Sequence, residues 1–155
     1  MRLRYLVLAL ALAPPAQAQN EAPPFSDPAL YRLPEREGIV PWRLLAQVKP
    51  VKVQDRLLPQ YSDGVIALDQ KTIRIQGFML PLEVGDRQRH FLLSAIPQSC
   101  PFHVHIGGAE TLVEVKASKP VAFTWDAVVM AGRLSVLKDD PDGVLYRLTE
   151  AVQSQ

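Results

Sequence analysis

From Val65 to Val152 the apolar residues repeat with a period of two, and this alternation constrains the fold more than any other feature of the sequence. Such alternation indicates strands that bury one face. Ile73 and Ile75 alternate with polar neighbours at the start of the region, and four further strand-like runs follow at 88–95, 111–117, 127–137 and 144–152. Turn-forming residues separate the runs, so we expect a mainly β fold.

The apolar residues change phase at Gly77. Phe78, Leu80 and Leu82 occupy even positions, whereas the apolar positions before the glycine are odd. A glycine at such a slip is typical of a β-bulge, which bends a strand sharply. Five strands with a bent first strand predict a small five-stranded OB-like barrel. A β-sandwich would need about seven strands, more than the sequence supplies.

One short N-terminal helix is expected at residues 41–49. Pro41 suits a first helical position, Leu44, Leu45 and Val48 are spaced to form one apolar face, and Pro50 stops the helix. OB barrels usually carry a helix between the third and fourth strands, but residues 118–126 contain Pro120 and β-forming residues. We therefore expect the helix at 41–49 to cover one end of the barrel instead.

The first eighteen residues have the pattern of a cleaved signal peptide. Arg2 and Arg4 precede an apolar run at 5–13, and A-Q-A follows at 16–18. The run is well short of the roughly 20 residues that span a bilayer. We expect cleavage after Ala18, a periplasmic or secreted product that is not embedded in a membrane, a Pro-rich flexible arm at 19–38, and one OB-like domain at 39–155.

The charge balance excludes one class of partner. The chain has 17 Lys and Arg residues against 16 Asp and Glu residues. Proteins that bind nucleic acid carry a basic patch or stripe that neutralises phosphates. We therefore expect no nucleic-acid partner.

Cys100, His103 and His105 are the candidate metal ligands. Cys100 is the chain's single cysteine, so an exported form can make no internal disulfide, and the thiol needs protection from oxidation. A thiolate and two imidazoles favour zinc, with Cu⁺ as the second choice, and three protein ligands leave a fourth position open. The alternative is that Cys100 is a small buried apolar residue and both histidines face solvent.

Three further residues are candidates for a fourth ligand or for a supporting hydrogen bond. Met79 follows the expected bulge, Glu83 ends the first strand, and Glu110 follows two glycines after the candidate ligands. Met79 has the alternative role of a core residue, and either glutamate could orient a histidine ligand. His90, which follows Arg87 and Arg89, is expected to be an exposed strand residue.

Several segments resemble a family of bacterial exported proteins of unassigned function. The most specific is G-F-M-L-P-L-E at 77–83, preceded by G-I-V-P-W at 38–42 and followed by the Cys100 segment, so the resemblance covers most of residues 38–137. Some members are linked with ABC transporters and zinc handling. The resemblance therefore implies a site at Cys100, His103 and His105 and an ABC transporter or another periplasmic protein as partner. Many relatives have a second cysteine at the position of His103, which leaves zinc and copper both open.

Two classes of function follow. The first is a periplasmic metal-binding accessory protein that binds or traffics zinc, or copper, through the C-x2-H-x-H segment. The second is a metal-free interaction module that docks a transporter or an envelope partner. An enzyme is less favoured, because no residue at an informative spacing would orient a Cys–His pair, and a metal-activated water would need a positioned carboxylate.

Overall fold

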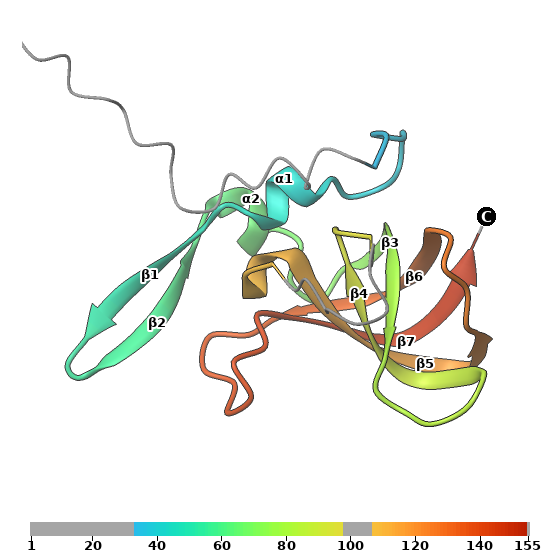
Figure 1. Cartoon of the computed structure of the whole chain (residues 1–155). Helices are drawn as coiled ribbons and strands as arrows, with labels where there is room; N and C mark the ends of the chain where they lie inside the picture. Colours follow the sequence, from blue (N-terminus) through green and yellow to red (C-terminus); the bar gives the residue numbers. More distant parts are fainter. Residues whose placement is uncertain (1–32, 98–106, 155) are drawn as a thin grey trace, which may run out of the picture.

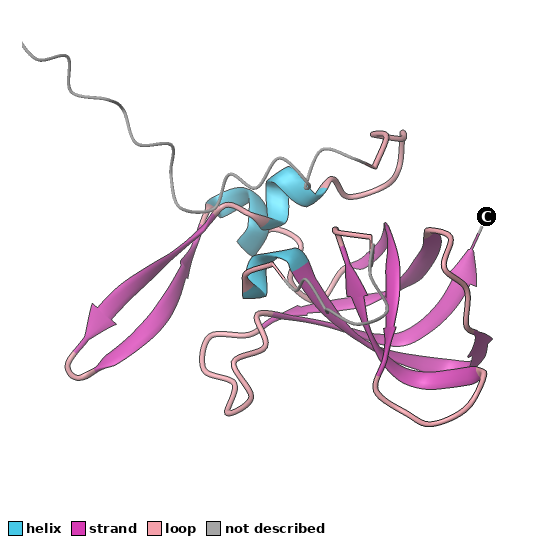
Figure 2. Ribbon diagram, viewed as in Figure 1, coloured by secondary structure: helices cyan, strands magenta, loops and turns pink. Residues whose placement is uncertain are grey.

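Five strands close into a barrel, which confirms the predicted OB-like fold class (Figures 1 and 2). The structure is a computed structural model and describes residues 33–97 and 107–154. The strands pair in the order β3-β4-β5-β7-β6, with β6 returning to β3, and all pairs are antiparallel except β5 with β7. The barrel strands are β3 (Thr72–Pro81), β4 (Arg87–Ser94), β5 (Leu112–Ala122), β6 (Val128–Val136) and β7 (Tyr146–Ser154).

Side chains from all five strands fill the barrel. In β4, β5 and β6 the predicted inward positions Phe91, Leu93, Val113, Val115 and Leu134 are fully buried. Burying an apolar side chain of this size stabilises the fold by roughly 1.5–3 kcal/mol. The barrel core is therefore formed by the apolar residues of the period-two pattern.

The predicted change of phase at Gly77 is wrong. Odd-numbered residues stay buried from Ile73 to Met79, whereas Phe78 and Leu80 are half-buried on the outer face and Leu82 is exposed. What changes at this glycine is the partner strand, because residues up to Gly77 pair with β6 and residues from Phe78 pair with β4. The strand thus turns from one neighbour to the other without a slip of its side chains.

Gly77 permits this turn because it lies against β4. A Cβ atom at this position would be 2.7 Å from Cγ of Leu93 and 2.8 Å from the backbone oxygen of Ser94. No other residue fits such an approach without moving the backbone.

The segment before the barrel differs from the prediction. Helix α1 (Trp42–Leu45) is shorter than expected, and Val48, Lys49 and Pro50 belong to strand β1 (Val48–Val53). Strand β1 pairs with β2 (Arg56–Tyr61) in a separate two-stranded hairpin, and a second helix, α2 (Asp63–Ile66), follows. The hairpin and α2 were not predicted, and the period-two pattern begins at β3, not at Val65.

The short helices cover one end of the barrel, between it and the hairpin (Figure 2). Trp42 and Leu45 of α1 and Val65 of α2 belong to the same buried cluster as the barrel residues. The hydroxyl of Tyr146 in β7 donates to the backbone oxygen of Leu45 at 2.5 Å. Helix α1 therefore caps the barrel as expected.

No helix lies between β5 and β6 in the described chain, as expected from Pro120 and the β-forming residues around it. The chain there is the end of a strand followed by a loop. The only other helical turn in the described residues is η2 (Ala109–Thr111), a 3-10 turn before β5. Within 33–97 and 107–154, no helix has the length and apolar character needed to cross a membrane.

Candidate functional site

Cys100, His103 and His105 lie in the segment 98–106, outside the described residues. The residues on either side of this segment lie together at one end of the barrel. Ala95 donates its backbone N–H to the oxygen of Thr111, and a Cβ on Gly107 would lie 2.9 Å from Cδ1 of Ile96. The segment therefore leaves β4 and returns at η2 within a short distance.

Met79 and Glu83 both have structural roles in the barrel, one in the core and the other in a turn. Met79 is 2% exposed and belongs to the barrel core. Oε2 of Glu83 accepts the backbone N–H groups of Arg89, at 2.7 Å, and His90, at 3.1 Å. These two hydrogen bonds hold the pKa of Glu83 below its ordinary value. Glu83 thus fastens the turn between β3 and β4, whereas the candidate metal ligands follow the other end of β4.

Glu110 lies closest in the chain to the candidate ligands and is 6% exposed. Its carboxylate folds back over Gly108, where a Cβ would meet both carboxylate oxygens at 2.4 Å. Among the residues that the structure describes, no hydrogen bond or ion pair reaches this carboxylate. The carboxylate oxygens of this largely buried residue thus keep contact with solvent and are open to a further partner.

No group of three or more His, Cys, Asp and Glu side chains that could hold a metal ion is found within 33–97 and 107–154. The candidate ligands all lie outside those ranges, so their grouping stays a prediction.

The structure brings together a charge cluster that sequence reasoning missed. Glu114 of β5 is largely buried, and three cationic or titratable side chains surround it. Nε2 of His90 lies 2.8 Å from Oε1, Nζ of Lys116 lies 3.6 Å from the same oxygen, and Nε of Arg147 donates to Oε2. Nη2 of Arg147 also donates to Asp140 at 3.0 Å.

Electrostatics in this cluster favour the ionised carboxylate. Burial alone would raise the pKa of Glu114, but hydrogen bonds from Arg147 and His90 and the charges of Arg147 and Lys116 outweigh it and leave the pKa lowered. The hydrogen bond to Glu114 raises the pKa of Arg147 in turn. The cluster ties together β4, β5, β7 and the loop after β6, which is a structural role.

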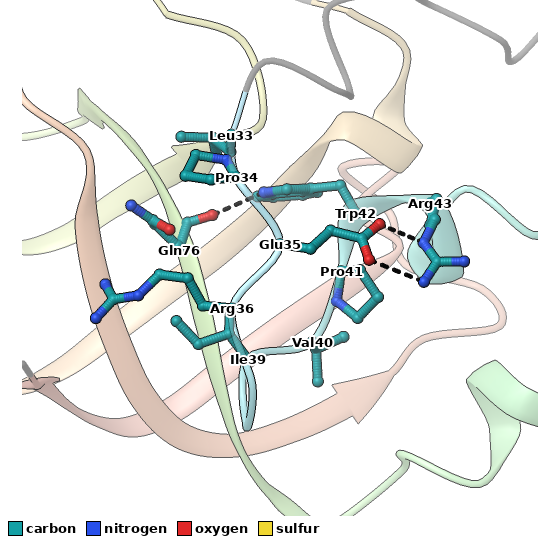
Figure 3. A pocket seen from close by; sticks show the side chains of 10 residues that line it. All are labelled: Leu33, Pro34, Glu35, Arg36, Ile39, Val40, Pro41, Trp42, Arg43 and Gln76. Carbon is teal, nitrogen blue, oxygen red and sulfur yellow. Dashed lines mark hydrogen bonds and ion pairs between the residues drawn. The ribbon is translucent and has the colours of Figure 1, made fainter.

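A small pocket lies beside Trp42, at the start of α1. Figure 3 shows Leu33 and Pro34 next to the indole, whose Nε1 donates to the backbone oxygen of Gln76 at 2.7 Å. Glu35 forms a two-pronged ion pair with Arg43 at 2.5 and 3.0 Å. The volume is about 160 Å³, below the roughly 300–1,000 Å³ of ordinary ligand pockets. The pocket is thus too small for an ordinary ligand, and the hydrogen bond from Trp42 to Gln76 holds α1 on β3.

A larger groove, of about 400 Å³, lies between the β1–β2 hairpin, η2 and the loop that joins β6 to β7. Apolar side chains form most of its wall: Val48, Pro50, Leu57, Pro59, Leu137 and Leu145. Glu110 and Lys138 line it too, and in the described chain neither side chain has a hydrogen bond or an ion pair. This volume is within the range of ligand pockets.

Comparison with known families identifies the chain at the family level. A family model described as "Protein of unknown function (DUF3299)" matches residues 45–150. The chain belongs to the DUF3299 family. The predicted resemblance to a family of unknown function is thus confirmed, whereas the proposed motif, the Cys/His site and the transporter link stay predictions.

Among solved structures, the chain is similar to a DUF3299 family protein from Pseudomonas aeruginosa PAO1. The two are 20% identical, the match covers 63% of this chain and 68% of that one, and the TM-score is 0.48. No curated protein matches the chain.

The DUF3299 match includes one of these two hollows and not the other. All residues that line the groove, and the candidate ligands Cys100, His103 and His105, lie within 45–150. The pocket beside Trp42 is lined mainly by residues 33–43, outside the match. The groove and the 98–106 segment therefore lie within the region that the family model matches.

Proposed function

We propose that the protein is a periplasmic accessory protein that binds one zinc ion, or Cu⁺, through Cys100, His103 and His105. The observation that carries the proposal is the presence of three nitrogen and sulfur donors within six residues. Thiolate and imidazole are the ligands that these ions prefer. A site with three protein ligands keeps one coordination position open, which suits an ion that is passed on.

The ends of the segment support this proposal. Ser94 and Ile96 are linked by two hydrogen bonds of 3.0 Å, one from each residue. After the segment, the backbone oxygen of Thr111 accepts the N–H of Ala95, which fixes the returning chain beside β4. Because both ends are fixed at the same end of the barrel, closing the segment around an ion costs less chain entropy than closing a free peptide. The barrel would then serve as a rigid mount for the site.

Delivery to a transporter or another envelope protein is the second part of the proposal. It rests on the apolar run and A-Q-A pattern of residues 1–18, which imply export, and on the resemblance to exported proteins linked with zinc handling. Mass spectrometry of the protein from a periplasmic fraction tests export, with residue 19 expected as the first residue.

The metal site is tested by elemental analysis and by calorimetric titration with Zn²⁺ and, under reducing conditions, Cu⁺. We expect about one ion per chain. Cys100→Ser and His103→Ala should each weaken binding tenfold or more, about 1.4 kcal/mol, because each removes one ligand. His90→Gln is the matched control, since His90 pairs with Glu114 on the barrel wall.

Binding that is equal in the wild type, Cys100→Ser and His103→Ala would contradict the site, and so would the absence of binding. A loss of affinity in His90→Gln as large as that in His103→Ala would move the site to the barrel wall and contradict the proposal as well.

A further inference from the structure

We propose that the groove between the β1–β2 hairpin, η2 and the β6–β7 loop binds an extended segment of a partner protein in which apolar residues flank a Lys or Arg. Two features carry this inference. One is Glu110, a largely buried residue whose carboxylate has no partner in the described chain, and the other is the set of apolar side chains that line the groove.

The carboxylate of Glu110 favours a ligand with a cationic group. It is 6% exposed, it lines the groove, and no hydrogen bond or ion pair reaches it in the described chain. Arg56 pairs with Asp139, and Arg147 pairs with Asp140 and Glu114. Lys138 also lines the groove, but its side chain is exposed and forms no ion pair with Glu110. An ammonium or guanidinium group from a ligand would supply the missing donors and the opposite charge.

The other side chains of the groove favour a ligand that also has apolar groups. Its walls are formed by Val48, Pro50 and Pro59 on the hairpin side and by Leu137 and Leu145 on the barrel side. Leu57 also lines the groove, yet it is 72% exposed. A large apolar side chain left in water at the rim gains free energy when a partner covers it.

The extent of this surface favours a polypeptide over a small amphiphile. The hairpin projects away from the barrel (Figure 1), and each of its strands has six residues, or roughly 20 Å. Pro50 and Pro59 lie opposite each other and donate no backbone hydrogen bond, so an added strand would pair poorly along these edges. We therefore expect the partner segment to lie across the apolar side chains of the groove with its cation at Glu110.

This inference does not rest on the proposed metal site. A ligand cation at Glu110 requires no ion at Cys100, and peptide binding is measured with both zinc-free and zinc-loaded protein. Leu57→Ser, on the hairpin, is expected to keep the zinc stoichiometry of the wild type, so the two proposals fail separately.

The probe is a fluorescein-labelled peptide, G-V-L-K-L-V-G, with uncharged ends. Its partner probes have Gln or Glu in place of the central Lys, and binding is followed by fluorescence anisotropy. We expect the Lys peptide to bind about tenfold more tightly than the Gln peptide and the Glu peptide to bind least. In Glu110→Gln the Lys and Gln peptides should bind within about twofold of each other.

Leu57→Ser tests the apolar part without risk to the core, since Leu57 is mostly exposed. We expect all three peptides to bind at least about threefold more weakly to it. Glu37→Gln and Val84→Ser are the matched controls, because both residues are exposed and lie outside the groove. Circular dichroism confirms that each variant is folded.

Four results would overturn the proposal. They are no binding of the Lys peptide at millimolar concentration, equal binding of the Lys and Gln peptides, unchanged selectivity in Glu110→Gln, and binding of n-hexylammonium as tight as that of the Lys peptide. A self-association in ultracentrifugation that Leu57→Ser abolishes would also overturn it, because the occupant would then be a second copy of this chain.

Discussion

Replacing Gly77 with alanine is expected to lower the free energy of unfolding by about 3 kcal/mol, and so the midpoint of thermal unfolding by roughly 10 °C. The added Cβ would lie 2.7 Å from Leu93 and 2.8 Å from the backbone oxygen of Ser94. The side chain of Leu93 is fully buried and cannot turn away, and the oxygen belongs to the β4 backbone. The strand must therefore move at the position where it changes partners. Urea unfolding at pH 7 measures the loss.

Gly64→Ala is the matched control for this substitution. Gly64 lies in α2, and its added Cβ would come within 3.1 Å of only Cδ1 of Leu44. Alanine is also the better helix former by about 1 kcal/mol, so the control should change stability by no more than about that amount. Equal stabilities of Gly77→Ala and the wild type would show that β3 and β4 do not approach each other as described.

Glu114→Gln is expected to cost about 2–3 kcal/mol at pH 7. The substitution keeps the shape of the side chain but removes the charge that faces Arg147, His90 and Lys116. Breaking a buried ion pair costs about 3–5 kcal/mol, and Arg147 keeps its second partner Asp140, which reduces the loss. Urea unfolding again supplies the measurement, with exposed Glu37→Gln as the control.

The same carboxylate makes stability depend on pH. Because the pKa of Glu114 is lower in the folded protein than its ordinary value of 4.5, the folded state holds the proton less tightly than the unfolded state does. Its contribution to stability is therefore complete above about pH 5 and is lost as the pH falls through 4.5 and below. The difference in stability between the wild type and Glu114→Gln should shrink over this range. A difference that stays constant from pH 7 to pH 3 would contradict the assigned ion pair.

The sequence predicted the barrel because its strands follow the simplest pattern. Ile73 and Ile75, Phe91 and Leu93, and Val113 and Val115 are buried at alternate positions, as expected. The phase of β3 after Gly77 could not be predicted, because its outer face is itself apolar at Phe78 and Leu80. Only the position of β4 shows that the small glycine belongs inside.

The hairpin was missed because it lacks both of the usual signals. Only Val48 and Tyr61 are buried among its residues, so no alternation is visible. Its turn is formed by Gln54, with φ of 54°, and Asp55, in place of the Asn-Gly pair that marks such turns.

The charge cluster around Glu114 could not be predicted, since its partner Arg147 is 33 residues away in the chain. The groove depends on both the hairpin and the β6–β7 loop, and so could not be predicted either.

The position of β7 in the barrel has a consequence for folding kinetics. This strand pairs with both β5 and β6, and its pairing with β5 is parallel. The barrel therefore cannot close until the chain has been made as far as β7, and β5 must wait with one edge open. Pairings between segments distant in sequence form slowly, because the entropy of closing the loop is lost before the contacts form. We expect a late, single closing step that is rate-limiting, during which the exposed edge of β5 is the part of the chain most open to wrong pairing.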